Sequence, residues 1–408
     1  MIRRLLSFLI LIVIATSVFA NPVTQWNTIA NETFARTEGT NPMAQSRTYA
    51  ILHASIHDAV NAIDPRFAPY TAGLPATPDA SLDAAVAAAA REVLVTLLPD
   101  DAARIEAAYA QALSTIADSP AKTAGIALGK AAASATLVRR ANDGMQTAAQ
   151  PVYAPKLGAG EYQFTGPFNF AAQPSWGRVQ PFVIDLRKHS VEGPQPLTSA
   201  DYAKDLAYIR AIGASTSATR TAEQSEIARF WYEDSPIGWN RIANSVARQR
   251  DLDPWRAARA FALVNFAMAD GFIAGFEAKY RFRFWRPETA IHQVDPEWKP
   301  FLITPPVPDY PSTHTVLGWA AAEVLRNLFG DDVRFTATSL TLPGVTRTFK
   351  SFSAAAEENG QSRLYAGIHF KHAVKDGKSQ GRSVGREVAG ALVASSMSSA
   401  ANARKTSR

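Results

Sequence analysis

The residues best suited to chemistry lie in "KYRFRFWRPETAIH", residues 279–292, directly after the apolar stretch "RAFALVNFAMADGFIAGFEA". Four cations alternate there with four aromatic side chains; they are Lys279, Arg281, Arg283 and Arg286. Aromatic residues favour burial, but like charges resist burial unless something negative lies among them. The segment therefore predicts a bound anion.

Lys279 and Arg286 are seven residues apart, so two helical turns would place both on one face. Arg283 satisfies helical spacing from Lys279 equally well, and spacing alone leaves both arginines open. Arg286 precedes Pro287, and a residue before proline is disfavoured in the helical conformation. We therefore expect the helix to end before Arg286 and the chain to be extended there.

A second string, "PDYPSTHTVLGWAAAEVL", begins with two prolines that favour an extended approach to an apolar helix. Ser312, Thr313 and His314 stand at the start of that helix. A helix start offers free backbone N–H groups and the positive end of the helix dipole, which together favour an anion. Capping by Ser312 or Thr313 would explain the hydroxyls, but it would not explain the histidine that follows.

A third string, "SRLYAGIHFKHAVKDG", places Arg363 six residues before His369, with His372 three residues further on. Each string is weak evidence alone. A cationic helix face, a helix start carrying Ser and His, and an Arg–His pair together describe a pocket for a tetrahedral oxyanion. The three strings therefore predict one site.

The remaining histidines offer other chemistry. His53 and His57 lie at i and i+4 beside Asp58, an arrangement that could bind zinc or iron. No third ligand follows at suitable spacing, so we favour packing inside a bundle with hydrogen bonds to the neighbouring loop. His189 lies in a polar loop and is predicted to be solvated. His292 either supports the basic segment or has no role.

Apolar residues recur at helical spacing over most of the chain, which predicts an all-α fold of two packed helical bundles. The predicted helices are roughly residues 44–63, 79–97, 100–117, 120–142, 199–213, 221–233, 240–250, 253–280, 314–329 and 380–397. We expect an N-terminal bundle over 21–150, a Pro/Gly-rich connecting segment over 151–196, and a C-terminal bundle over 197–400 that holds the anion site.

Boundary signals agree with these helices. Ser81, Asp100 and Ser199 are candidate N-caps, and Asp253 is a cap followed by a first-turn proline. Strand-like alternation is scarce. Only residues 335–344, "FTATSLTLPG", suggest an arm of a hairpin.

The first twenty residues, "MIRRLLSFLILIVIATSVFA", have a charged start, an apolar core and a small-x-small ending. This pattern is typical of a secretory signal peptide, so we expect an exported protein, periplasmic or secreted, with no membrane span in the mature chain. The chain has no cysteine, so disulfides cannot support it. Of the formal net charge of +6, two charges belong to this leader and three to the basic tail 401–408. The nearly balanced body gives no reason to expect nucleic-acid binding.

The three strings resemble the signature shared by vanadium-dependent haloperoxidases and the type 2 phosphatidic acid phosphatase superfamily. That signature is K-x6-R-P, then P-S-G-H, then S-R-x5-H-x3-D. Here it reads Lys279-x6-Arg286-Pro287, Pro311-Ser312-Thr313-His314 and Ser362-Arg363-x5-His369. The stretches "FWYEDSP" and "HDAVNAIDPRF" also resemble exported bacterial haloperoxidase relatives, so the likeness covers most of the mature chain.

The resemblance implies a role for each matching residue. His369 would bind vanadate directly, or attack phosphorus in a phosphatase. Three cations, Lys279, Arg286 and Arg363, would neutralise the oxyanion, and Ser312 with the Thr313 backbone N–H would complete its cradle. His314 would be the acid–base partner, oriented by Asp234 of "FWYEDSP", although the adjacent Glu233 leaves that register open.

Two positions depart from the pattern. Thr313 replaces the usual glycine; its N–H can still donate, but its Cβ restricts the backbone and should narrow the pocket. Ala373 stands where an aspartate is expected, so another group must orient His369. The candidates from the sequence are His372, Asp376 or a backbone carbonyl.

The resemblance implies a vanadate cofactor and oxidation of halide by hydrogen peroxide to a hypohalous acid equivalent. One cage of fixed cations also suits phosphoryl transfer, since both reactions place charge on three equatorial oxygens. A soluble acid phosphatase that hydrolyses a phosphoester through a phosphohistidine is therefore the alternative, and a non-catalytic oxyanion-binding relative is a third. Length favours the peroxidase, because soluble acid phosphatases with this signature are much shorter. Phe276 and Val307, pocket positions in the family, indicate no particular halide.

Overall fold

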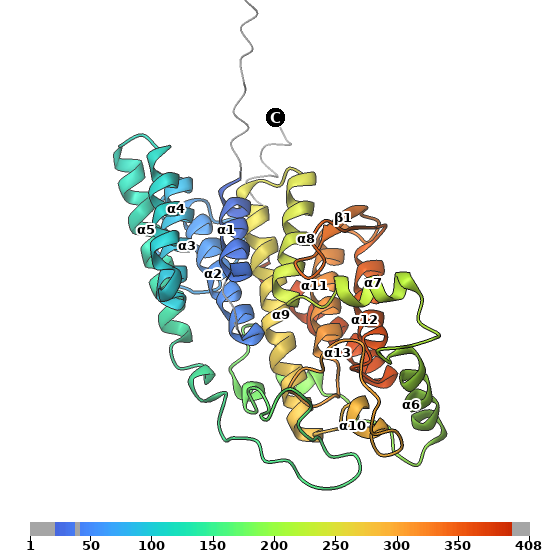
Figure 1. Cartoon of the computed structure of the whole chain (residues 1–408). Coiled ribbons are helices and arrows are strands. Elements are labelled where there is room, and N and C mark those ends of the chain that lie inside the picture. Colours follow the sequence, from blue (N-terminus) through green and yellow to red (C-terminus); the bar gives the residue numbers. More distant parts are fainter. Residues whose placement is uncertain (1–20, 37–40, 394–408) are drawn as a thin grey trace, which may run out of the picture.

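A computed structural model describes residues 21–36 and 41–393, and its fold is all-α, as predicted (Figure 1). The helices are α1 Pro22–Arg36, α2 Pro42–Ile63, α3 Leu82–Leu97, α4 Ala102–Ser114, α5 Pro120–Arg140, α6 Ala200–Ile212, α7 Ala222–Phe230, α8 Ser235–Gln249, α9 Pro254–Phe282, α10 Pro287–Ile291, α11 Thr313–Phe329, α12 Phe352–Tyr365 and α13 Lys371–Ala389. The predicted leader 1–20 and the basic tail 401–408 lie outside the described residues.

Local chemistry explains where several helices begin. Ser81 accepts the backbone N–H of Ala84 at the start of α3, Ser199 caps α6, and Asp253 caps α9 with Pro254 in the first turn. These predicted caps are confirmed. Asp100 is not a cap, because it lies inside a short 3₁₀ turn that leads into α4.

Three helices were missed. Polar Asn and Thr residues obscure the apolar face of α1, although Val23, Trp26 and Ala30 are buried at helical spacing. The other two are α10, a five-residue helix after Pro287, and α12, whose apolar residues form no clear stripe. The predicted hairpin arm is confirmed: β1 (Phe335–Thr338) pairs antiparallel with β2 (Thr346–Phe349).

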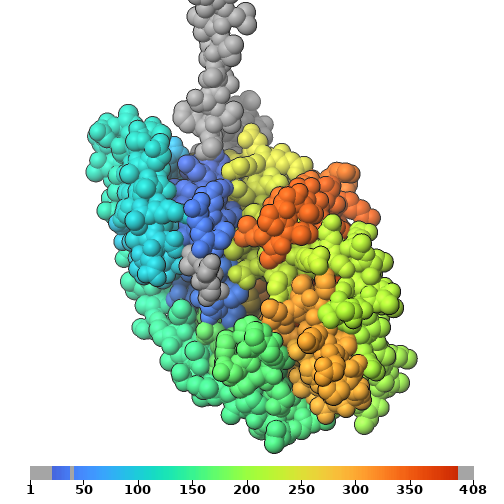
Figure 2. Space-filling model, viewed as in Figure 1, coloured from blue at the N-terminus to red at the C-terminus, as the bar shows by residue number. Residues whose placement is uncertain are grey.

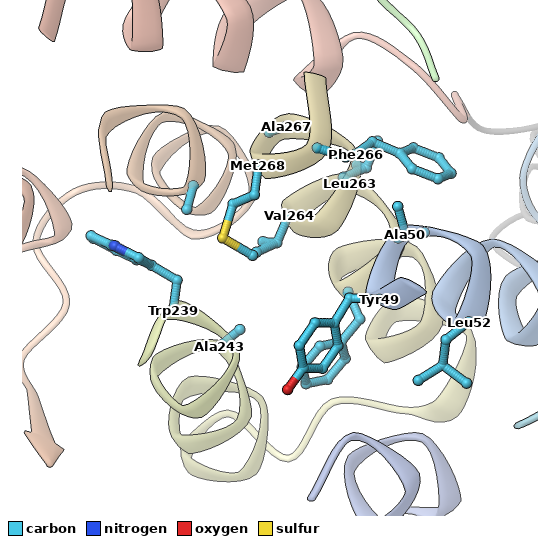
Figure 3. Close-up of a cluster of buried hydrophobic side chains, with 14 of the residues drawn as sticks. Tyr49, Ala50, Leu52, Trp239, Ala243, Leu263, Val264, Phe266, Ala267 and Met268 are labelled. Carbon is cyan, nitrogen blue, oxygen red and sulfur yellow. The ribbon is translucent and has the colours of Figure 1, made fainter. Parts of the chain in front are cut away.

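Helix α9 is the centre of the fold, and it lies between the N-terminal and C-terminal helices in Figure 1. It packs against α2 on one side and against α11 and α13 on the other. In Figure 3 its apolar side chains meet Tyr49 and Ala50 of α2 and Trp239 of α8. One continuous core therefore joins the two bundles.

The length and hydropathy of α9 also meet the criteria for a membrane span, contrary to our expectation that no later stretch would. The mean hydropathy of its most apolar window is 1.3, and 94% of that window is buried inside the fold. Among the described residues it is the one helix that passes this test, and its burial by neighbouring helices is that of a core helix.

The connecting segment, drawn in green, wraps over the lower part of the molecule in Figure 2. Beyond two short 3₁₀ turns, residues 151–196 form no helix. Asp270 on α9 is fully buried and accepts the backbone N–H groups of Phe182, Val183 and Ile184, at 2.6, 2.8 and 3.1 Å. This carboxylate fixes the segment against the core. The domain boundaries at 150 and 196 stay a prediction.

We expect Asp270→Ala to lower the free energy of unfolding by about 3 kcal/mol or more, because three N–H groups would lose their acceptor. Denaturant unfolding followed by circular dichroism measures this loss. Asp118→Ala is the matched control, since that exposed carboxylate pairs with Lys122 at the surface, and its effect should be small beside that of Asp270→Ala. Equal losses for the two variants would show that Asp270 does not anchor the segment.

Candidate functional site

Three cations are buried together in the C-terminal half. Lys279, Arg286 and Arg363 are at most 2% exposed, and each has its pKa lowered, first by burial. Arg281 and Arg283 are more exposed and pair with Glu277 and Glu161 at the surface. The structure therefore chooses Arg286 over Arg283, as the family pattern implied.

Backbone geometry explains this choice. Helix α9 ends at Phe282, and the next residue, Arg283, has a left-handed φ of 50°, so the chain turns away from the helix axis. At Arg286 the backbone is extended, with φ −82° and ψ 157°, as expected before Pro287. The side chain of Arg286 then returns to the interior beside the end of Lys279.

Backbone carbonyls hold these cations. Lys279 Nζ donates to the carbonyl oxygens of Pro308 and Asp309, at 2.6 and 3.0 Å. Arg286 donates from Nε to the Val307 carbonyl and from Nη1 to the Ile368 carbonyl, at 2.7 and 2.6 Å. Neutral carbonyls fix the two side chains without cancelling their charge, so the site stays electropositive.

His369 lies among the cations, and its neighbours define its tautomer. Arg286 Nη1 is 3.0 Å from His369 Nε2 and can only donate, so Nε2 is the unprotonated nitrogen. Its Nδ1 therefore carries the hydrogen, and Asp309 Oδ1 lies 2.8 Å from it. His369 Nδ1 and Asp309 Oδ1 are close together and buried, but their alignment departs from that of an ideal hydrogen bond. Nε2 keeps a lone pair for an electrophile.

Asp309 is the functional residue that the sequence reasoning missed. It is fully buried, and burial raises its pKa to about 7 against the opposing effects of Arg286, His372 and Lys279. The proposed alternatives serve elsewhere: His372 Nδ1 pairs with Asp205, and Asp376 accepts the Tyr310 hydroxyl. The carboxylate that the motif expects at position 373 is therefore replaced by that of Asp309, in the loop before α11. The available signal was one acid among the prolines of "PPVPDYP".

The start of α11 contributes backbone donors. Ser312 occupies the N-cap position but its side chain makes no capping bond; its hydroxyl accepts from Thr315 instead, at 3.0 Å. Simple capping is therefore not its role. The methyl group of Thr313 packs where a Cβ on Gly275 would stand. Because Gly275 on α9 has no side chain, there is room for the side chain of Thr313 at the position where the family pattern has glycine.

His314 is partly buried, and its pKa lies well below the ordinary value, mainly through burial and then through the charge of Arg363. Its Nε2 lies 2.9 Å from the Trp231 carbonyl, which Arg363 also contacts at 3.3 Å. A carbonyl only accepts, so Nε2 carries the hydrogen. The imidazole is neutral in the anion-free site.

The predicted carboxylate partner of His314 is wrong in this geometry. Backbone oxygen, not the Asp234 carboxylate, holds the imidazole. Asp234 accepts a hydrogen bond from Gln45 at 3.4 Å, and burial raises its pKa to about 6. Glu233 pairs with Arg241 at 2.6 Å. The string "FWYEDSP" could not reveal that the backbone carbonyl of Trp231 points towards His314 in the folded chain.

These groups line one cavity of about 560 Å³. Arg286, Arg363, His369, His314 and Thr313 line its inner end, and the fully buried Lys279 and Ser312 support them from behind. Its walls also include residues of α2, of the connecting segment and of the start of α8. The cavity therefore opens where the two bundles meet, although its charged groups all belong to the C-terminal one.

The remaining histidines have structural partners. His53 contacts Asn27 and His57 the carbonyl of Ala68 in the following loop, each at 3.1 Å, which confirms the packing interpretation. Burial lowers their pKa values to about 3 and about 4. His292 contacts the Trp298 carbonyl. His189 was predicted to be solvated, but it is buried against Glu387 at 2.9 Å, because α13 passes beside its loop.

Buried cations around an unprotonated histidine nitrogen, in the lining of a cavity in an all-α fold, are chemically suited to an oxyanion. A family model described as the second helical-bundle domain of VCPO matches residues 259–396. A vanadium chloroperoxidase of Curvularia inaequalis is 25% identical over 282 residues, which cover 50% of this chain and 46% of that relative. The chain thus matches less than half the length of that curated relative.

Solved structures match over more of the chain. The crystal structure of a bacterial vanadium-dependent iodoperoxidase has a TM-score of 0.82 and 28% identity, covering 91% of this chain and 96% of the other. A holo-type bacterial vanadium-dependent chloroperoxidase has a TM-score of 0.74 over 88% and 94% of the two chains; at 17% identity this likeness concerns the fold. The chain is thus similar to vanadium haloperoxidases, in sequence over residues 259–396 and in fold over nearly its whole length.

We expect Asp309→Asn to weaken vanadate binding by roughly ten- to a hundredfold, because a neutral amide holds the His369 Nδ1–H less firmly. Isothermal calorimetry with vanadate measures the change. The Asp309 backbone carbonyl that holds Lys279 is retained in this variant. Asp376→Asn is the matched control and should bind almost as the parent does. A larger loss for Asp376→Asn than for Asp309→Asn would contradict our assignment.

Proposed function

We propose that this protein oxidises a halide with hydrogen peroxide to a hypohalous acid equivalent, using vanadate as its cofactor. The observation that carries the proposal is the site itself: three buried cations surround a histidine whose unprotonated Nε2 accepts a hydrogen bond from Arg286. The 28% identity to an iodoperoxidase structure, over nearly the whole length of both chains, supports the same reaction class.

The residues present fit vanadate. Arg363 Nε is buried without a hydrogen-bond partner. An unused buried donor of this kind indicates that the site binds an acceptor such as an anion. Arg286, Arg363 and Lys279 would neutralise the oxygens, Ser312 and the Thr313 N–H would complete the cradle, and His369 Nε2 would be the ligand. Bound vanadate supplies a Lewis-acid centre that activates peroxide toward halide.

The state of His314 supports peroxide chemistry. Hydrogen peroxide must lose a proton to become a good nucleophile, and a neutral imidazole can accept it. Burial keeps His314 neutral in the anion-free site. A phosphatase would need His314 protonated to donate to the leaving group, and a bound oxyanion raises the pKa of this histidine in either reaction.

Phosphomonoester hydrolysis is the second candidate, because one specific observation favours it. His369 has an unprotonated Nε2 and a carboxylate beside Nδ1, which is how a nucleophilic histidine is oriented. The signal-peptide pattern of residues 1–20 further leads us to propose that either reaction takes place in the periplasm or outside the cell.

Bromide oxidation and p-nitrophenyl phosphate hydrolysis, measured side by side on the mature protein, test the ranking. We expect vanadate-dependent bromination and weak hydrolysis without vanadate. Arg286→Ala should reduce bromination at least a hundredfold, since a donor fixed inside the cage would be lost. Fast hydrolysis without bromination at any vanadate concentration would reverse the ranking.

Arg283→Asn is the control for the Arg286 variant. It removes a nearby surface charge, and asparagine tolerates the left-handed backbone at this position. Bromination should fall less than twofold in this variant. Circular dichroism confirms that both variants are folded before activities are compared. Equal losses of activity would show that the cage does not depend on Arg286.

A further inference from the structure

One backbone carbonyl holds two of the groups that would act on a bound oxyanion. The Trp231 carbonyl oxygen accepts from His314 Nε2 at 2.9 Å and from Arg363 Nη1 at 3.3 Å. His314 is the expected acid–base group, and Arg363 is one of the three buried cations. A shift of this carbonyl would disturb both groups together, so the contacts that fix Trp231 bear directly on the site.

The loop of the β-hairpin fixes the backbone just before this carbonyl. Trp231 follows the last residue of α7, and the final carbonyls of a helix lack partners within it. The Ser339 hydroxyl donates to the Phe230 carbonyl at 2.5 Å, and the Thr341 hydroxyl donates to the Arg229 carbonyl at 2.7 Å. The Trp231 carbonyl, next along the chain, is left to the two groups in the site.

The indole of Trp231 is fixed by a carboxylate. Its Nε1 donates to Glu358 Oε1 at 2.9 Å, and the buried ring packs beside Trp239 and Phe349. Glu358 lies on α12, the helix that also carries Arg363. One hydrogen bond therefore ties the residue that presents the carbonyl to the helix that presents one of its donors.

Glu358 is itself held by an arginine of the hairpin. Arg347 on β2 donates to both of its carboxylate oxygens, from Nε at 2.7 Å and from Nη2 at 2.9 Å. A bidentate pair of this kind fixes the direction of the carboxylate as well as its position. Arg347 Nη1 also donates to Glu226 of α7 at 2.7 Å. Arg347 therefore connects the hairpin with α7 and α12, which lie beside it in Figure 1.

We propose that Glu358 is a positioning residue for the chemistry of this site. It acts through the Trp231 indole, which keeps the backbone carbonyl against His314 and Arg363, and it is not itself among the residues that line the cavity. The competing explanation is that Glu358 only stabilises the fold through Arg347, a role that it would share with Glu226. The expected effect on turnover rests on the proposed function, whereas the expected effect on vanadate binding does not.

Vanadate binding, measured by isothermal calorimetry without peroxide or halide, distinguishes the two explanations. Glu358 and Glu226 both lie 2.7 Å from Arg347, but of the two only Glu358 accepts from the indole. We expect Glu358→Leu to weaken vanadate binding about tenfold, because the acceptor of His314 and Arg363 is no longer fixed. Glu226→Leu removes the same charge and should bind within twofold of the parent. Glu358→Gln keeps an oxygen for the indole N–H and should bind within threefold.

If Glu226→Leu bound vanadate as weakly as Glu358→Leu, Glu358 would act only through the arginine, and the proposal would be overturned. A tenfold loss in Glu358→Gln would also overturn it, since the indole needs only an acceptor.

Trp231→Phe tests the same bond from the other side and decides the matter even where Glu358→Leu does not fold. It removes the indole N–H and leaves Glu358 paired with Arg347. We expect a loss of vanadate affinity of about tenfold, and binding like that of the parent would overturn the proposal. The variant that combines Trp231→Phe with Glu358→Leu should lose no more than either single variant, because both remove one hydrogen bond. Additive losses would show that the two residues act independently.

Turnover at saturating vanadate separates this proposal from the proposed function. Where the parent brominates, Glu358→Leu should lower kcat/KM for hydrogen peroxide about tenfold and leave KM for bromide within twofold, because His314 acts on the peroxide. An unchanged kcat/KM for peroxide would overturn the positioning role and leave the proposed function intact. A parent that oxidises no bromide would contradict the proposed function, while the vanadate affinities of the variants would still decide the role of Glu358.

Discussion

The structure depends on one constraint: three cations are buried side by side, and among the described residues Asp309 is the one carboxylate within ion-pair distance of them, 3.9 Å from Arg286. Like charges in a medium of low dielectric repel strongly, so such a cluster persists only where other dipoles compensate. The segment 305–309 supplies these dipoles, because its carbonyls accept from Lys279 and Arg286. Prolines suit this task, since they present a carbonyl and have no N–H to satisfy.

Carbonyl dipoles fix the cations but leave their net charge, and that distinction gives the site its function. A full set of carboxylates would have produced a neutral, inert ion-pair network. Asp309, whose pKa is raised to about 7, compensates the cations incompletely near neutral pH. The remaining positive charge lies on buried side chains that line a cavity, where an oxyanion gains most from fixed donors. The fold around α9 holds these donors in place before any anion arrives.

The charged cage could be predicted from the sequence because its members follow fixed local spacings. Lys279, Arg286, Arg363 and His369 all lie where three short strings place them. Asp309 was missed because the carboxylate of His369 lies 60 residues earlier in the chain, and no spacing rule reports a contact made by folding. The prediction for Asp234 was wrong for a related reason. Its position in the motif fits, but the backbone carbonyl of Trp231 contacts His314 in place of the Asp234 carboxylate.

The same segment that neutralises Lys279 and Arg286 through its carbonyls also carries the side chain that faces His369. Orientation of the histidine and stabilisation of the cations are therefore coupled through a few residues before α11. A carboxylate on α13, at the position of Ala373, would have separated these tasks between a helix and a loop. Here a shift of Asp309 would change the histidine, the lysine and the entry to the helix start together. The loop thus has to be rigid, and its four prolines between Pro305 and Pro311 restrict the backbone in the way that this coupling requires.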